Sequence, residues 1–320
     1  MTGQGRPAPA APEAHIPARP GGGAAEEGLG TEPAWERLLG VRTAETAAEA
    51  GLLRGEDGVW RWAVPASSGA QTLAALYTPL CLGGPGYAFA QLGQSIDGFI
   101  ATRTGHSNYV TGEEDRLHLH RLRALSDAVL VGAGTTIADD PQLTVRACAG
   151  TNPVRVVLDP RGRAGRETPG ARVFTDGKAP TLRLVGTGHA PTAGRAGRTG
   201  AAGEGGSAAA GQGDEEVVEL PRGEAGFDPR LVLETLARRG LGRVLVEGGG
   251  ATVSGFLRAE VLHRLYVTVA PVLLGDGVPG LRFPGPVRMG EALRPRTRAF
   301  GLGADMLFEL DLLDLLDGTA

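Results

Sequence analysis

The sequence predicts an α/β fold with a mainly parallel central sheet. Residues 128–131 and 244–246 are short apolar runs of the kind that form buried strands, and each run ends in a glycine-rich turn. A helical pattern follows the second turn, over residues 251–259. Strands that alternate with helices favour parallel pairing. Because the carboxyl ends of parallel strands meet at one edge of a sheet, both turns are expected to line one crevice that suits a nucleotide-sized ligand.

The elements before the first glycine turn are predicted from periodicity and helix-capping residues. Residues 87–94 and 99–102 are expected strands on either side of a turn at residues 95–98. Thr111 and Glu114 form the pattern of a capping box, which predicts a helix that runs to about Leu125.

The elements after the first glycine turn alternate in the same way. Asp228 and Pro229 are expected to begin a helix that Gly240 ends. The last two expected strands suggest a C-terminal antiparallel hairpin beside the parallel sheet. Strands are expected at residues 153–159, 171–174, 181–185, 216–220, 264–274 and 306–313.

The chain divides by composition into a tail, a small segment and one large domain. Residues 1–30 are rich in Pro, Gly and Ala and are expected to be a disordered tail. Residues 31–86 contain all three tryptophans, weak helical patterns and a possible strand at residues 60–64, and Pro79 should interrupt the apolar run at residues 73–82. The role of this segment stays open. Residues 87–316 form the large domain, with a Gly-, Ala-, Thr- and Ser-rich insertion at residues 186–213 that is expected to be disordered.

Composition excludes several classes of protein. The net charge of −4 provides no general attraction for nucleic acid, and no apolar run approaches the ~18 residues of a membrane span. Cys81 and Cys148 show no metal-ligand spacing, so no metal site is expected. The absence of a recognisable signal peptide favours the cytoplasm. Lys178 is the only lysine, which leaves phosphate binding to arginine.

The two glycine turns differ in what they indicate. The first, at residues 132–137, has Ile137 in place of the third glycine of a dinucleotide-binding fingerprint, which argues against a Rossmann dehydrogenase. The second, Gly248 to Gly250, precedes a helix whose first amides lack acceptors and therefore suit a diphosphate. Both turns could also be glycine-rich for steric reasons alone. Glu247, just before the second turn, is either a solvated strand end or a site residue.

Several polar residues have ordinary interpretations. His118 and His120 lie about 200° apart on a helix, cannot share a metal ion, and are expected on the surface. Arg121 and Arg123 would usually form a solvated face. The pair Asp139–Asp140 before a proline is either a turn or part of a site. Neither His-x-Glu nor Pro-Cys-x-x-Cys occurs, which argues against zinc-dependent base deamination.

Seven motifs follow one another along the chain: QSIDG at 94–98, GHSNY at 105–109, HRLR at 120–123, the stretch 131–146, PVRVVLD at 153–159, VEGGG at 246–250 and APVLLG at 270–275. In this order they resemble the RibD C-terminal family, the reductase domain of riboflavin-biosynthesis deaminase/reductases. The resemblance implies a dihydrofolate-reductase-like three-layer fold, NADPH as hydride donor and a homodimer. It implies reduction of 5-amino-6-(5-phosphoribosylamino)uracil to its ribitylamino product.

The resemblance also implies roles for individual residues. Catalytic positions are Glu247, Asp97 and Gln91. Substrate positions are Ser107, Arg123, Leu143, Arg146 and Glu247, where the arginines suit a phosphate. Cofactor positions are Gly93, Tyr109, Gly134, Thr135, Asp139, Arg161, Gly248, Gly249, Gly250, Ala251, Thr252, Val253, Ser254 and Gly255.

The sequence departs from the family pattern at three places. Gln91 stands where many members have a lysine, so a group able to give a proton is replaced by an amide. Pro160 replaces a cofactor-contacting serine, and we expect Arg161 or Arg163 to meet the 2′-phosphate of NADPH instead. The deaminase half is replaced by the unrelated residues 1–86. The alternatives are therefore a reductase of the same fold with another small substrate, or a non-catalytic nucleotide-binding protein.

Overall fold

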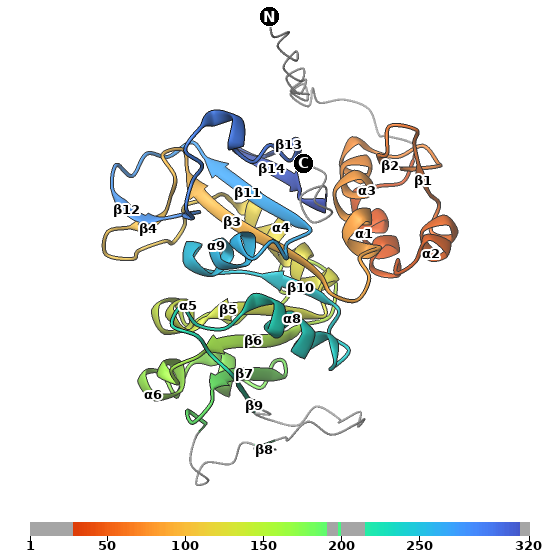
Figure 1. Ribbon diagram of the computed structural model, residues 1–320. Helices are drawn as coiled ribbons and strands as arrows, with labels where there is room; N and C mark the ends of the chain where they lie inside the picture. Colours follow the sequence, from red (N-terminus) through yellow and green to blue (C-terminus); the bar gives the residue numbers. More distant parts are fainter. Residues whose placement is uncertain (1–27, 191–197, 200–214, 314–320) are drawn as a thin grey trace, which may run out of the picture.

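The computed structural model describes residues 28–190, 198–199 and 215–313, and its centre is a ten-stranded sheet (Figure 1). The strand order is β13-β14-β11-β3-β10-β5-β6-β7-β9-β8. The strands are β3 (Tyr87–Ser95), β5 (Ala128–Gly132), β6 (Val154–Asp159), β7 (Thr181–Gly186), β8 (Arg198–Thr199), β9 (Glu215–Leu220), β10 (Arg243–Val246), β11 (Arg264–Ala270), β13 (Arg296–Leu302) and β14 (Asp305–Asp311).

The pairing confirms the predicted sheet. All neighbours from β11 to β8 are parallel, whereas β14 pairs antiparallel with both β11 and β13. The two strands expected to form the C-terminal hairpin, β11 and β14, do pair antiparallel, but the hairpin itself is β13–β14, and the sequence reasoning missed β13. Because the chain crosses over between parallel strands, the ends of β3, β10, β5 and β6 meet at one edge of the sheet.

Helices cover both faces of the sheet, which confirms the three-layer architecture. The helices α8 (Pro229–Ala237) and α9 (Gly250–Arg258) lie on one face and α4 (Glu113–Leu125) on the other (Figure 1). Alternate residues of the strands point to opposite faces, and each face has its own buried apolar cluster. Central strands covered on both sides read as continuous apolar runs, which is why β5 and β10 are recognisable in the sequence.

Four local predictions were wrong. The expected strand at 171–174 is helix α7 (Arg172–Thr175), and β11 ends at Ala270 rather than at 274. The first glycine turn opens a helix, α5 (Ala133–Asp139), that follows β5 directly. Helix α4 begins after Gly112 without a side-chain cap, so the capping box does not form.

The segment before the sheet is a compact unit. It consists of α1 (Thr31–Leu39), α2 (Ala44–Glu49), β1 (Leu52–Arg54), β2 (Trp60–Trp62) and α3 (Ser68–Cys81). Pro79 does not interrupt α3. The Ala75 carbonyl oxygen, which a proline at position 79 leaves without its helical donor, accepts from the Arg298 guanidinium at 2.8 Å. Leu29 bridges Ala66, so residues 28–30 belong to this unit rather than to the expected tail. Figure 1 shows the unit beside α4 and the β13–β14 hairpin.

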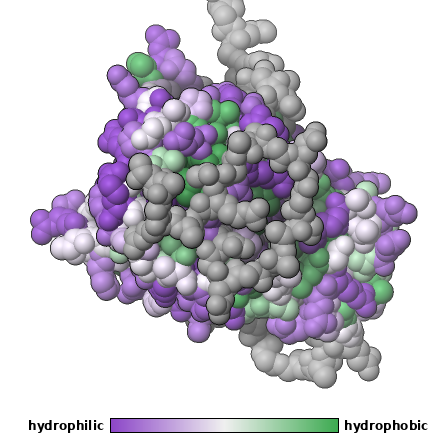
Figure 2. Space-filling model, turned by 90° about the horizontal axis from the view of Figure 1, so that it is seen from below, coloured by the Kyte–Doolittle hydropathy of each residue, from purple (hydrophilic) through white to green (hydrophobic). Residues whose placement is uncertain are grey.

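The remaining features lie at the surface. An arm formed by β4 (Phe99–Thr102) and β12 (Gly277–Pro279) projects from the sheet, and a short 3-10 helix, η1 (Met289–Glu291), follows it. Among the described residues, no helix has the length and apolar character that a membrane crossing requires. The described surface in Figure 2 is mostly hydrophilic. The tail at 1–27 and most of the predicted insertion lie outside the described residues, although Gly186 ends β7.

Candidate functional site

The two glycine turns meet at the carboxyl edge of the sheet, as the sequence predicts. The Gly249 amide donates to Thr135 Oγ1 at 3.0 Å. Gly248 has a φ of +105°, and a Cβ at this position would lie 2.9 Å from the same hydroxyl oxygen. A Cβ at Gly132 would lie 2.7 Å from Thr252 Oγ1. Glycine is required here because each turn approaches a threonine of the other.

A third segment, which the sequence reasoning missed, joins these turns to the turn after β3. The Gly280 amide donates to the Gly98 carbonyl oxygen at 2.9 Å. A Cβ at Gly250 would lie 1.9 Å from the Gly280 carbonyl oxygen, so only glycine fits. The Arg282 amide donates to Ser254 Oγ at 2.8 Å. The side chain of Ser254 is thus used within the protein, and no local pattern around Gly280 announces this contact.

The start of α9 has the features of an anion site. Gly249 caps the helix without a side-chain hydrogen bond. The Thr252 amide donates to the Gly249 carbonyl oxygen at 3.0 Å, whereas the amides of Gly250 and Ala251 have no acceptor among the described residues. Ala251 is exposed and Thr252 is half-buried, whereas the side chain of Val253 is fully buried in the core. Among the predicted cofactor residues of this helix, Val253 can therefore contribute only its backbone.

Glu247 forms a buried two-point ion pair with Arg123. The guanidinium of Arg123 on α4 donates to both carboxylate oxygens at 2.7 and 2.8 Å, and also to the Thr144 carbonyl oxygen at 3.1 Å. Both side chains are more than nine-tenths buried. Arg123 is therefore no solvated surface residue. Fixed on Glu247, it is a poorer candidate for a substrate phosphate than the sequence suggests.

Gln91 lies in a second polar cluster between β3 and α4. Its amide donates to the two oxygens of Asp115 at 3.3 and 3.4 Å, and the Thr268 hydroxyl donates to Asp115 Oδ1 at 2.6 Å. Burial raises the pKa of Asp115, and the nearby Asp305 carboxylate adds to this effect. A Cβ at Gly93 would lie 2.8 Å from Thr111 Cγ2 and 3.3 Å from Asp115 Oδ2. Sequence reasoning missed Asp115 and Thr268, which no motif marks.

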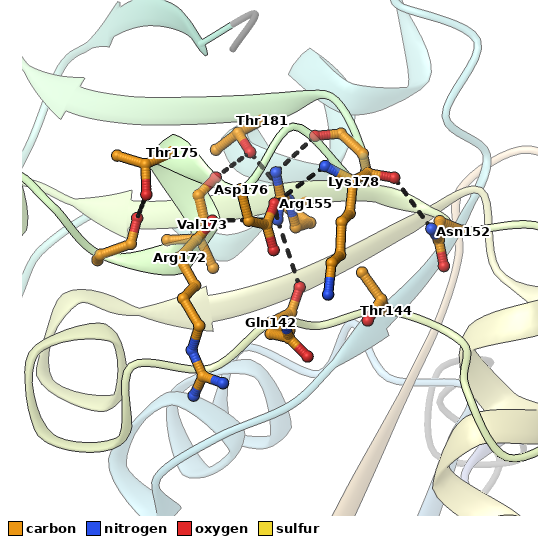
Figure 3. A network of polar contacts seen from close by, with 12 residues as sticks. Gln142, Thr144, Asn152, Arg155, Arg172, Val173, Thr175, Asp176, Lys178 and Thr181 are labelled. Carbon is orange, nitrogen blue, oxygen red and sulfur yellow. Dashed lines mark hydrogen bonds and ion pairs between the residues drawn. The ribbon is translucent and has the colours of Figure 1, made fainter. Parts of the chain in front are cut away.

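The loop that carries Leu143 and Arg146 is held in place by a buried arginine. Figure 3 shows the Arg155 guanidinium between the loop and the turn before β7. It donates to Asp176 Oδ1 at 2.6 Å and to the Gln142 carbonyl oxygen at 3.5 Å. Leu143, buried at a φ of +55°, follows directly. Such a conformation persists only where neighbouring contacts hold it.

Arg146 leaves this loop toward solvent, close to Arg123. Its guanidinium donates to Thr144 Oγ1 at 2.8 Å, so Thr144 contacts both arginines. The Arg146 amide donates to Nδ1 of His120, which is buried. The prediction that His118 and His120 lie on the surface was therefore wrong. Burial, followed by the Arg123 charge, lowers the pKa of His120 to about 4.

Two predicted residues lie on the loop before α4. Tyr109 is 71% exposed, with the Arg116 guanidinium 4.3 Å from its ring centre. Ser107 is half-buried, and its carbonyl oxygen accepts from the Val110 amide. Each carries a hydroxyl group that could contact a ligand, and their roles stay predictions.

Asp97 holds two loops together. It accepts hydrogen bonds from the Ser95 hydroxyl at 2.5 Å and from the Gly275 amide at 2.7 Å. These bonds, led by that of Ser95, hold the pKa of Asp97 below its usual range. An ionised carboxylate with several donors favours a structural role, and its catalytic role stays a prediction.

The remaining predicted cofactor residues line the same edge farther along the sheet. Gly134 and Asp139 are exposed on α5. Arg161, just after β6, is exposed, whereas Arg163 is paired with Glu167 at 3.0 Å. An open hollow of about 530 Å³ lies beyond them at the ends of β7 and β9, and none of the predicted residues lines it. Within the described ranges, no group of three or more His, Cys, Asp or Glu side chains could hold a metal ion.

Comparisons with known proteins agree with this geometry. The family model of the RibD C-terminal domain matches residues 87–296. The chain is 34% identical, over 70% of its length, to 96% of a 2,5-diamino-6-ribosylamino-4(3H)-pyrimidinone 5′-phosphate reductase from Methanothermobacter thermautotrophicus. It is 32% identical, over 69% of its length, to riboflavin biosynthesis protein RibD from Aquifex aeolicus, of which it spans 56%.

Solved structures show the same fold. RibD from Acinetobacter baumannii aligns with 84% of this chain and 67% of its own, with a TM-score of 0.55 and 23% identity. The family match covers the strands of the sheet from β3 to β11, but not the β13–β14 hairpin, and it covers every strand end that carries a predicted site residue. The chain therefore belongs to the RibD C-terminal domain family of riboflavin-biosynthesis reductases.

Proposed function

We propose that the protein is an NADPH-dependent reductase that converts 5-amino-6-(5-phosphoribosylamino)uracil to its ribitylamino product. The observation that supports this most directly is the buried Glu247–Arg123 pair, which adjoins the meeting point of the glycine turns at Gly248 and Gly132. A buried charge pair at the end of an apolar strand is costly for stability alone, and its position beside an anion site indicates ligand recognition.

The residues present fit NADPH. The uncapped start of α9 would hold the diphosphate, and the positive φ of Gly248 leaves its backbone open to close approach. Arg161 would meet the 2′-phosphate, because it is exposed and no ion pair is recorded for it within the described ranges. NADPH, when bound, supplies the hydride for the ribosyl carbon.

The remaining residues would bind and orient the pyrimidine substrate. Glu247, fixed by Arg123, would accept hydrogen bonds from the ring N–H groups. Arg146 would bind the phosphate, because its guanidinium reaches solvent while that of Arg123 is engaged. Aligning the substrate in a crevice with these groups is the chain's contribution to the rate. Like other members of its family, the protein would act as a homodimer.

A second substrate is supported by the relatives. The Methanothermobacter protein, matched over 96% of its length, is a reductase of 2,5-diamino-6-ribosylamino-4(3H)-pyrimidinone 5′-phosphate. The two compounds differ at one ring position, where an amino group replaces a carbonyl oxygen. Gln91 in place of the usual lysine leaves a third possibility, another small substrate for the same fold.

A turnover assay separates these functions. Purified protein is mixed with NADPH and either pyrimidine, and the decrease in NADPH absorbance is followed. Oxidation with the phosphoribosylaminouracil at a higher kcat/KM than with the diamino compound supports the first proposal, and the reverse order supports the second. Tight NADPH binding without turnover of either compound would contradict both. An Arg146→Ala variant should raise the substrate KM by about 10²-fold, roughly 2.7 kcal/mol, without weakening NADPH binding.

A further inference from the structure

The N-terminal unit of residues 28–86 packs directly on the helix that carries the site residues. Its buried apolar side chains and those of α4 belong to one cluster, which also includes residues of the sheet such as Phe89 and Tyr266. Among its members are Trp35, Leu38, Tyr77 and Leu80 from the unit, and Leu122 and Leu125 from α4. The unit is therefore continuous with the core of the reductase domain rather than tethered beside it.

One buried hydrogen bond links the unit to the middle of α4. The Tyr77 hydroxyl lies 2.6 Å from Nδ1 of His118, and both groups are buried. The other ring nitrogen of His118 has no hydrogen-bond partner. Burial lowers the pKa of His118 to about 3, so the ring is neutral and the bond persists at physiological pH. The ring also contacts Tyr266 of β11, with ring centres 5.3 Å apart.

A second hydrogen bond links the unit to the loop that carries Arg146. The indole N–H of Trp35 donates to the Ala149 carbonyl oxygen at 2.9 Å. The next residue, Gly150, approaches both Leu39 of the unit and Ala124 of α4. The end of this loop is therefore enclosed between α1 and α4.

Both anchored elements also carry site residues. Helix α4 holds Asp115 one turn before His118 and Arg123 little more than one turn after it. The loop contributes the Thr144 carbonyl oxygen to Arg123 and the Arg146 guanidinium to the surface. Because the backbone hydrogen bonds of a helix keep its residues in a fixed arrangement, a contact at His118 also affects the positions of Asp115 and Arg123.

We propose that Tyr77 and Trp35 are positioning residues of the substrate side of the site. Through them the unit of residues 28–86 is a brace that holds α4 and the loop at 143–150 in register with Glu247. This inference rests on the proposed function for its kinetic readout only. The cofactor side, formed by α9 and the turn after β5, has no recorded hydrogen bond to the brace within the described ranges.

The test compares three variants that each remove one buried donor. Tyr77→Phe removes the bond to His118, and Trp35→Phe removes the bond to Ala149. Trp62→Phe is the matched control, because the Trp62 indole donates at 2.8 Å to Ala70 inside the brace and not to α4 or the loop. The KM of the pyrimidine, kcat, the Kd of NADPH and the melting temperature are measured for each full-length protein.

The brace predicts a selective change. Tyr77→Phe and Trp35→Phe should each raise the substrate KM about threefold to tenfold, the range that the loss of one buried hydrogen bond produces, and leave the Kd of NADPH unchanged. Trp62→Phe should lower the melting temperature by about as much as the other two variants do, but it should not change the substrate KM. The proposal would be overturned if all three variants kept the substrate KM of the wild-type protein, or if Trp62→Phe raised KM as much as the other two variants.

Hydrogen exchange makes the test independent of the reaction. Should the wild-type protein reduce neither pyrimidine, the proposed function fails but the brace can still be measured. Amides of residues 113–125 should then exchange faster in Tyr77→Phe, and those of residues 143–150 in Trp35→Phe, whereas Trp62→Phe should leave both segments protected. Unchanged exchange of both segments in Tyr77→Phe and Trp35→Phe would contradict the brace.

Discussion

Glu247 and Arg123 couple recognition to stability at the level of single residues. Each neutralises the other in a buried environment, so removing one charge leaves the second without a partner. We expect Glu247→Gln to lower the free energy of unfolding by about 3–5 kcal/mol and to abolish turnover. The apolar double variant Arg123→Met/Glu247→Leu should recover most of the stability but no activity. Urea unfolding measures the stability of each variant and NADPH oxidation measures its activity. An active double variant would refute the role of the pair in ligand recognition.

Asp115 should make stability depend on pH. Its folded pKa is raised, chiefly by burial, above the value of about 3.9 in the unfolded chain. The folded state therefore binds this proton more tightly than the unfolded state does. The resulting contribution to the free energy of unfolding is full below the unfolded pKa and is lost as the pH rises through the folded pKa. Asp115→Asn cannot ionise and should remove that decline. Urea midpoints measured upward from about pH 4 check this, and parallel curves for both proteins would contradict it.

The same cluster shows what Gln91, in place of the family's lysine, changes around Asp115. Gln91 and Thr268 donate hydrogen bonds to the carboxyl group of Asp115, but neither brings a positive charge that would stabilise its ionised form. A lysine at position 91 would supply that cation. The family pattern located position 91 from the sequence, but the identity of its partner came only from the packing of α4 against β3.

At the scale of elements, α9 contains two glycines with opposite requirements. A Cβ at Gly250 would lie 1.9 Å from the Gly280 carbonyl oxygen, whereas nothing lies within 4 Å of a Cβ at Gly255. Gly250→Ala should therefore destabilise the protein by about 3 kcal/mol and weaken NADPH binding. Gly255→Ala should stabilise it by roughly 0.5–1 kcal/mol, because alanine suits a helix better. Thermal unfolding measures the pair, and equal effects would show that the crowding at Gly250 is relieved.

Helix α4 illustrates where element-level reasoning fails. Its histidines and arginines resemble a solvated face when the helix is considered alone. The docked N-terminal unit covers His118, and the sheet and loop enclose Arg123, so both residues are buried. Helical periodicity reports which residues share a side, but it does not reveal that a helix is covered on two sides.

At the scale of the molecule, the strand order determines which strand ends one bound dinucleotide could reach. Neighbouring strands lie about 4.8 Å apart, so the end of β6 is two strands from the end of β10 and within reach of a cofactor anchored at α9. Arg161→Ala should raise the Kd of NADPH about tenfold and leave that of NADH unchanged. Arg163→Ala is the control, since Arg163 already pairs with Glu167. Calorimetric titration measures both, and an equal loss for NADH would exclude a 2′-phosphate contact.

The sequence by itself determined most elements of the reductase domain and the family. Buried strands, helix starts and glycine turns depend on neighbouring residues, so Asp228, Pro229 and the runs of β5 and β10 could be interpreted locally. Only the tertiary structure decided which distant groups meet. Glu247 and Arg123 are 124 positions apart, and Asp115 and Thr268 are 153 apart. Such contacts, like the docking of residues 28–86, follow from the packing of the whole chain, because burial and charge pairing are summed over surfaces that no local pattern describes.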